Sequence, residues 1–128
     1  MNINDVKKIF DAIKEEIDNN KKELFVKEED TLKIIDKQTK KEIMLLSLDL
    51  NEKIEVVSLL LTKEQKEKAF FVVQEYQYLI WKEDEKYFIK SNPKSSKDDI
   101  YECFNNEKEL AEYILKYIEE NYYLLFEE

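Results

Sequence analysis

Residues 43–61 read Ile-Met-Leu-Leu-Ser-Leu-Asp-Leu-Asn-Glu-Lys-Ile-Glu-Val-Val-Ser-Leu-Leu-Leu. Two apolar segments, 43–50 and 54–61, flank the pair Asn51-Glu52, and this arrangement predicts a β-hairpin. Both segments carry apolar residues at odd and even positions, a pattern typical of central strands that are covered on both faces. We therefore expect an antiparallel sheet with the first helix on one face. The last helix or a partner subunit would cover the other.

The preceding residues repeat this pattern. Short apolar runs at 24–26 and 32–35 are separated by the acidic residues 28–30, and the polar residues 37–40 lead into the central hairpin. Successive hairpins predict an antiparallel meander.

A helix is expected before the first strand. Residues 3–18 place apolar side chains at spacings of three and four, as an amphipathic helix does. We predict Asn4 or Asp5 as its N-cap and Asn19-Asn20 as its end. Its apolar face consists of Ile3, Val6, Ile9, Phe10, Ile13 and Ile17.

A middle helix is expected after the central hairpin. Thr62 and Gln65 have the spacing of a capping box, so the helix would run from Lys63 to about Gln74. A helical stripe that continues through Ile80 is the alternative for this region.

A second hairpin is predicted next. Its strands would be 76–80 and 87–89, joined by a polar turn at 82–86. Residues 91–99 have the composition of a loop. A final helix begins in capping-box form at Asn106, with Leu110, Tyr113, Ile114, Tyr117, Ile118, Leu124 and Leu125 on its apolar face.

The predicted architecture is one compact α+β domain spanning residues 1–128. Its antiparallel sheet combines a meander with a hairpin, and its helices are N-terminal, middle and C-terminal. The element order is roughly α-β-β-β-β-α-β-β-α.

The amino-acid composition excludes several kinds of binding and catalytic site. The chain has no glycine and no histidine, and all 21 basic residues are lysine. Without glycine, the phosphate-binding loops of nucleotide enzymes cannot form. Without histidine and with a single cysteine, neither a Ser-His-Asp triad nor a zinc site of Cys and His ligands can be assembled. We expect a protein that is not an enzyme and that holds no cofactor or metal.

The net charge and the hydropathy of the chain limit the class of partner and the cellular location that we expect. The net charge of −9 argues against direct nucleic-acid binding. No apolar run approaches the ~20 residues of a membrane helix, and no secretory signal opens the chain. Cys103 has no partner in the chain, so we expect a half-buried structural thiol and a cytoplasmic location. Lysine used without arginine is typical of an AT-rich genome, as in low-GC bacteria and their phages.

Aromatic side chains gather in two places. At the end of the chain, Tyr122 and Tyr123 stand beside Glu119 and Glu120, which predicts an acidic-aromatic surface suited to a basic protein groove. The other place is the second hairpin, where a hydrophobic core, a protein interface and stacking on single-stranded nucleic acid are the alternatives. We expect Tyr78 on one face of this hairpin and Trp81 on the other. The aromatic residues there are Tyr76, Tyr78, Trp81, Tyr87 and Phe88.

Acidic clusters supply the other candidate contacts. Most such clusters are solvated turns and termini, and none has the ligand spacing of a calcium loop. Our candidate partner-binding residues are Glu119, Glu120, Tyr122 and Tyr123, followed by Glu83, Asp84 and Glu85.

These observations predict a small acidic protein that binds and inhibits another protein by occluding a basic groove. Proteins of the phage anti-defence (anti-CRISPR-like) or toxin-immunity kind act in this way. The expected partner is a nucleic-acid enzyme or a toxin with a basic surface, and the chain would be a monomer or homodimer. The alternatives are a structural or regulatory homo-oligomeric module and an enzyme with an unrecognised carboxylate site.

Overall fold

The computed structural model describes residues 1–19, 23–38, 40–48, 52–58, 78–91 and 100–126. The side chains of Ser58 and of residues 121–126 are not part of this description. The helix predicted for 63–74 and the aromatic residue Tyr76 lie outside the described residues.

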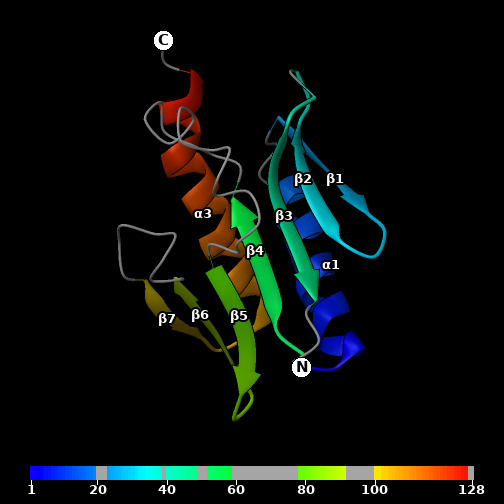
Figure 1. The fold of residues 1–128 in the computed structure, drawn as a ribbon, viewed down its shortest axis with the longest axis vertical. Helices are drawn as coiled ribbons and strands as arrows, with labels where there is room; N and C mark the ends of the chain where they lie inside the picture. The colour runs from blue at the N-terminus through cyan, green and yellow to red at the C-terminus, as the bar shows by residue number, and fades with distance from the viewer. Residues whose placement is uncertain (20–22, 39, 49–51, 59–77, 92–99, 127–128) are drawn as a thin grey trace.

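In the described part of the chain, seven strands form one antiparallel sheet whose spatial order follows the chain from β1 to β7 (Figure 1). Each strand pairs with the next one along the chain, so the predicted meander continues through the second hairpin. The strands are β1 (Leu24–Glu28), β2 (Leu32–Asp36), β3 (Glu42–Leu48), β4 (Ile54–Ser58), β5 (Tyr78–Glu83), β6 (Lys86–Ser91) and β7 (Tyr101–Phe104).

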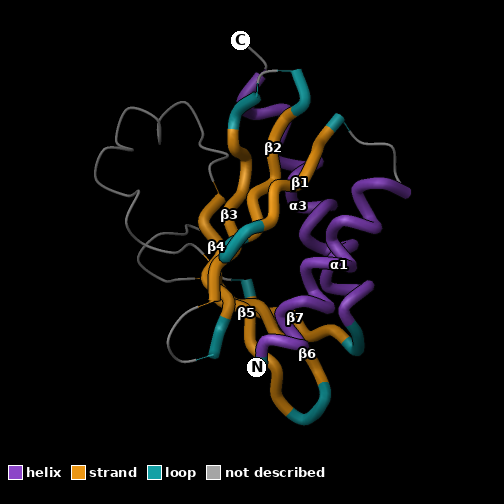
Figure 2. Tube along the Cα trace, turned by 90° about the vertical axis from the view of Figure 1, so that its right-hand side faces the viewer, coloured by secondary structure: helices purple, strands orange, loops and turns teal. Residues whose placement is uncertain are grey.

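The two described helices, α1 (Ile3–Asn19) and α3 (Glu107–Phe126), pack against each other on the same face of the sheet (Figure 2). Placing the last helix on the face opposite the first was therefore wrong. The apolar sides of both helices meet in one buried cluster that includes Ile9, Ile13, Leu110 and Ile114. The pair forms a single layer because each helix buries its stripe against both the other helix and the sheet.

The hydrophobic core lies between this helix layer and the sheet. Cross-strand register aligns Leu32 with Leu46, Leu46 with Val56, and Val56 with Tyr78, so one row of core side chains crosses β2 to β5. All four are buried. Full burial of a leucine or valine side chain contributes about 1.5–3 kcal/mol, so such rows hold the layers together.

Alternate residues of the same strands point to the other face of the sheet, which we call the helix-free face because neither of the two described helices covers it. Leu45 and Val57 lie there and are half-buried, whereas Leu79 is buried without belonging to the main core cluster. The predicted apolar character of both strand faces is therefore present.

The N-cap of α1 differs from the prediction. Asn2, rather than Asn4 or Asp5, caps the helix: its Oδ1 accepts a hydrogen bond from the Asp5 N–H at 2.9 Å. The Asp5 carboxylate accepts one in return from the Asn2 N–H at 3.3 Å. This reciprocal pair is a capping box in which aspartate takes the usual place of glutamate.

The cap of α3 follows the prediction closely. Asn106 Oδ1 accepts a hydrogen bond from the Glu109 N–H at 2.9 Å. The Glu109 side chain reaches back to the Asn105 N–H, also at 2.9 Å, which is one residue earlier than a standard capping box.

Two features of the sheet were mispredicted. The turn of the second hairpin is tighter than 82–86, because β5 extends to Glu83 and β6 begins at Lys86. The strand β7 was not predicted at all. Four residues are too few to show a clear alternation, and here only Phe104 is buried.

Candidate functional site

The acidic residues Glu83, Asp84 and Glu85 lie at the exposed tip of the β5–β6 hairpin. Asp84 and Glu85 form a two-residue turn with φ angles of 51° and 63°. Positive φ at both central residues is the requirement of a type I′ turn, whose twist matches that of the flanking strands. The chain builds this turn without glycine and thereby fixes two carboxylates at the end of a hairpin.

Two polar contacts tie this hairpin to the helices. Lys82 Nζ donates a hydrogen bond to Asp5 Oδ1 of α1 at 3.0 Å, and the two side chains are only 22% and 12% exposed. Tyr87 OH donates to Glu107 Oε1 of α3 at 2.7 Å. The Lys82 ammonium also lies 5.5 Å from the Tyr87 ring centroid. We call Asp5, Lys82, Tyr87 and Glu107 the polar network.

The polar network keeps its members in their ordinary charge states. Burial opposes ionisation of Asp5, but hydrogen bonds from Lys82 and Asn2, with nearby lysine charges, lower its pKa overall. The hydrogen bond to Asp5 raises the pKa of Lys82. Burial, then the bond to Glu107, raises the pKa of Tyr87, and the same bond lowers the pKa of Glu107. A general acid or base needs a pKa moved toward neutrality, so these shifts suit anchoring better than proton transfer.

Three aromatic side chains gather on the helix-free face of the sheet. Trp81 and Phe88 are paired across β5 and β6, with ring centroids 5.3 Å apart and planes at 13°. Tyr101 of β7 lies 6.0 Å from Trp81 and 6.2 Å from Phe88, and it is 65% exposed. We call Trp81, Phe88 and Tyr101 the aromatic patch. Contacts of this geometry stabilise beyond the area they bury.

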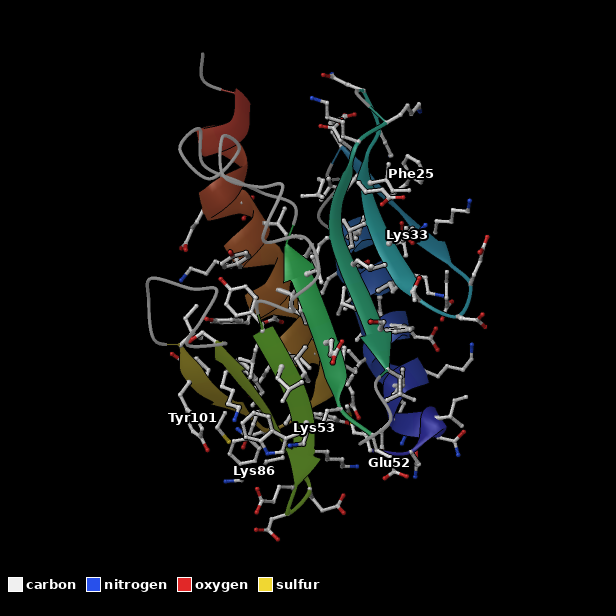
Figure 3. The ribbon with its side chains drawn as sticks, in the orientation of Figure 1. Phe25, Lys33, Glu52, Lys53, Lys86 and Tyr101 are labelled. Atoms are coloured by element: carbon white, nitrogen blue, oxygen red, sulfur yellow. The ribbon has the colours of Figure 1, made fainter. Side chains whose placement is uncertain are left out.

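Lysines and glutamates surround the aromatic patch. The Lys53 and Lys90 ammonium groups lie 6.0 Å and 5.6 Å from the Trp81 ring centroid. Trp81 Nε1 donates a hydrogen bond to Glu83 Oε2 at 3.4 Å, so patch and acidic tip adjoin. Figure 3 shows Lys53, Lys86 and Tyr101 together at one end of the molecule, with Phe25 at the other.

Cys103 adjoins the aromatic patch and is exposed. The prediction of a half-buried structural thiol was therefore wrong. Cys103 is opposite Phe88 in the β6–β7 register, and its position on an edge strand leaves it open to solvent.

The aromatic residues of the second hairpin lie on both faces of the sheet. Tyr78 and Tyr87 belong to the buried core, whereas Trp81 and Phe88 lie on the helix-free face. The prediction that Tyr78 and Trp81 lie on opposite faces of the hairpin is thus confirmed. Tyr78 OH lies 2.8 Å from Tyr117 OH of α3, in an edge-on ring contact.

The other residues that we predicted to bind a partner lie far from the hairpin tip. Glu119 and Glu120 are exposed on the C-terminal half of α3. Tyr122 and Tyr123 belong to the same helix, but their side chains are outside the description. Twelve residues of helix separate Glu107 from Glu119, roughly 18 Å of rise, and Figure 1 places this end opposite the hairpin. The predicted residues therefore form two surfaces.

An apolar cleft opens between the sheet and α3. Its volume of about 250 Å³ includes open solvent, and its lining consists of Met44, Val56, Tyr78, Ile89, Ile100, Tyr113, Ile114 and Tyr117. Ligand sites combine an apolar lining with a few converging polar groups. The lining here supplies only three tyrosine hydroxyls, two of which lie against each other, so we regard the cleft as looser core packing.

Within the described ranges, no group of three or more carboxylate or cysteine side chains is placed to hold a metal ion. No helix in that part of the chain is long and apolar enough to span a membrane. Comparison with protein-family models, with curated proteins and with solved structures finds no match for this chain.

Proposed function

We propose that this chain is a small acidic, non-enzymatic protein that binds another protein and inhibits it by occluding a basic groove. It would belong with inhibitors of the anti-CRISPR-like or toxin-immunity kind, and its partner would be a nucleic-acid enzyme or a toxin. The observation that carries the proposal is the exposure of Glu83, Asp84 and Glu85 at the tight turn of a hairpin that two polar contacts join to the helices.

Rigidity supports a binding role because it lowers the entropy lost on association. The polar network holds the base of the hairpin to both helices, through Asp5 on α1 and Glu107 on α3. The tight turn leaves few alternative backbone conformations at the tip. A partner would meet carboxylates already in position.

Electrostatics supports the choice of a basic partner. The chain carries −9 in all, and the Glu85 side chain is 93% exposed. Lys82 Nζ lies 3.6 Å from the Glu85 carboxylate but closer, at 3.0 Å, to the Asp5 carboxylate. It therefore neutralises the negative charge of the tip only in part. Opposite charges on a groove would accelerate encounter, and the effect would weaken with added salt.

The second proposed contact is the end of α3, with Glu119, Glu120, Tyr122 and Tyr123. Because it lies at the opposite end of the molecule from the tip, one groove would engage one of the two surfaces. We favour the hairpin tip because two anchoring contacts fix its position.

The test compares two charge-matched variants in capture from the native cell, or from the host if the protein is viral. The tip variant carries Glu83→Gln, Asp84→Asn and Glu85→Gln. The control carries Glu15→Gln, Asp18→Asn and Glu112→Gln, three exposed carboxylates on the helices. Each changes the net charge from −9 to −6. Asparagine also tolerates the positive φ at position 84.

We expect the capture to yield one basic partner. The wild-type protein and the control variant should inhibit it at similar concentrations. The tip variant should need at least tenfold more protein, and the wild-type interaction should weaken with salt. Equal losses in both variants would mean that overall charge, and not the tip, provides binding. Absence of any inhibited partner would overturn the proposed function.

A further inference from the structure

We infer that the aromatic patch is the surface on which a second copy of this chain packs face to face. The patch lies on the face that neither described helix covers, and it draws side chains from three neighbouring strands. Tyr101 at 65% exposure is one of three large hydrophobic side chains that the described residues leave exposed, and the others, Ile3 and Leu48, stand on other elements. A cluster of large aromatic side chains with a polar rim is the usual centre of a protein interface.

The charges around the patch favour a second copy over other partners. Strand alternation places Lys53, Lys86 and Lys90 on this face, together with Glu55 and Glu83. A single-stranded nucleic acid would require a cationic rim, and a basic groove would require an anionic one. A rim of mixed sign can be self-complementary, because a two-fold axis can place the lysines of one copy against the glutamates of the other.

The size of the aromatic patch sets the expected strength of self-association. A wholly buried aromatic side chain contributes about 150–250 Å², and Trp81 and Phe88 are already half-buried. The interface would fall in the small class, typical of weak or transient association. We therefore expect a reversible dimer with a Kd on the order of 10–100 μM, a free energy of about −5.5 to −7 kcal/mol.

The chain carries its own reporters of this contact. Trp81 is the only tryptophan and Cys103 the only cysteine, and both lie in or beside the patch. Packed sheets are about 10 Å apart and adjacent strands about 4.8 Å apart. Two copies of Cys103 would therefore lie on the order of 10–20 Å from each other.

The first experiment is a concentration series in sedimentation equilibrium, with Trp81 emission measured in parallel. The wild-type protein should shift from monomer to dimer, and the emission should move to shorter wavelength as Trp81 loses water. Tyr101→Glu should remain monomeric at least tenfold higher in concentration. Circular dichroism should show its fold unchanged, because the Tyr101 side chain is mostly exposed.

Phe25→Glu is the matched control. Phe25 is a half-buried aromatic residue on the helix-free face, with the Lys40 ammonium 5.4 Å from its ring, but it stands on β1 at the far edge of the sheet. Its variant should dimerise like the wild type. A dimer lost in Phe25→Glu and kept in Tyr101→Glu would place the interface elsewhere and overturn the inference.

Salt and cross-linking separate this inference from the proposed function. Two copies of net charge −9 repel, so added salt should strengthen self-association, whereas it should weaken binding to a basic partner. A bis-maleimide whose spacer matches the separation expected between the two copies of Cys103 should link two wild-type chains, and should fail with Tyr101→Glu. A protein that stays monomeric at high concentration and salt would refute the dimer, and binding of a labelled single-stranded oligonucleotide by that monomer through Tyr101 would assign the patch to nucleic acid instead. Either result would leave the inhibition assay of the hairpin tip to be judged separately.

Discussion

Glu85 stands in the left-handed backbone region at φ 63°, where a side chain is unfavourable. The left-handed conformation costs a residue other than glycine about 1–2 kcal/mol. Glycine avoids that cost but loses about 0.5–1 kcal/mol through its freer unfolded chain. We predict that Glu85→Gly raises the free energy of unfolding by about 0.5–1 kcal/mol in urea denaturation.

Two further variants identify the cause of that gain. Glu83→Gly, in the adjacent strand position, should lower stability by about 0.5–1 kcal/mol. Glu85→Gln removes the charge and keeps the backbone requirement, so it should match the wild type closely. If Glu85→Gln were as stabilising as Glu85→Gly, charge and not conformation would be the explanation.

Asp5 links the start of α1 to Lys82 on β5. Its pKa is lower in the folded protein than in the unfolded chain, where it is about 3.9. Its stabilising contribution is therefore complete above that value and disappears as the pH falls through the folded pKa. We predict that Asp5→Asn costs about 1–2 kcal/mol at pH 7, and that its difference from the wild type shrinks steadily below about pH 5.

Urea denaturation of both proteins between pH 7 and pH 3 measures this effect. Asp11→Asn is the control, since Asp11 is 56% exposed and its ion pair with Lys14 spans 3.4 Å. It should change stability by less than about 0.5 kcal/mol. A constant difference between Asp5→Asn and the wild type across this pH range would contradict the assigned role of the ion pair.

At the scale of the element, α3 depends on its first turn. Asn106 accepts a hydrogen bond from the N–H of Glu109, and an alanine at this position would leave that N–H to solvent. We predict that Asn106→Ala lowers the thermal stability by an amount equivalent to about 1 kcal/mol, and that Asn106→Asp restores it. Asn105→Ala should have little effect, because Asn105 contributes its main-chain N–H to Glu109.

At the scale of the whole molecule, the charge of −9 opposes folding through self-repulsion. We predict that the melting temperature rises by a few degrees between 20 and 300 mM NaCl, measured in dilute protein to avoid association. The variant with Glu15→Gln, Asp18→Asn and Glu112→Gln should respond less, because its net charge is −6. A melting temperature that falls with salt would mean that attractive ion pairs dominate.

Much of this fold was predictable because its contacts are local in sequence. Six strands follow from apolar runs and turn residues, and α1 and α3 follow from their helical spacing. The strand β7 was missed because four residues with one buried side chain carry little pattern. The shared face of the two helices could not be predicted either, since both faces of β3 and β4 are apolar and periodicity does not say which face a helix takes.

The candidate surfaces were only partly predictable. Glu83, Asp84 and Glu85 were found because an acidic run between two apolar segments indicates an exposed turn. The aromatic patch was missed as a unit because Tyr101 joins Trp81 and Phe88 only through the pairing of β6 with β7. Exposure of Cys103 likewise follows from its place on an edge strand, which depends on strand order.

The strictly sequential strand order has a consequence for synthesis. Four of the six strand pairs (β1–β2, β2–β3, β3–β4 and β5–β6) are joined by connections of two to five residues, so most of the sheet can form strand by strand from local contacts. The α1–α3 contact is different, because α1 leaves the ribosome early, and the part of its apolar side that packs on α3 is covered only after the residues from Glu107 onward have been made. A nascent chain stalled after β7 should therefore bind trigger-type chaperones through α1, and the completed chain should release them when the two helices dock.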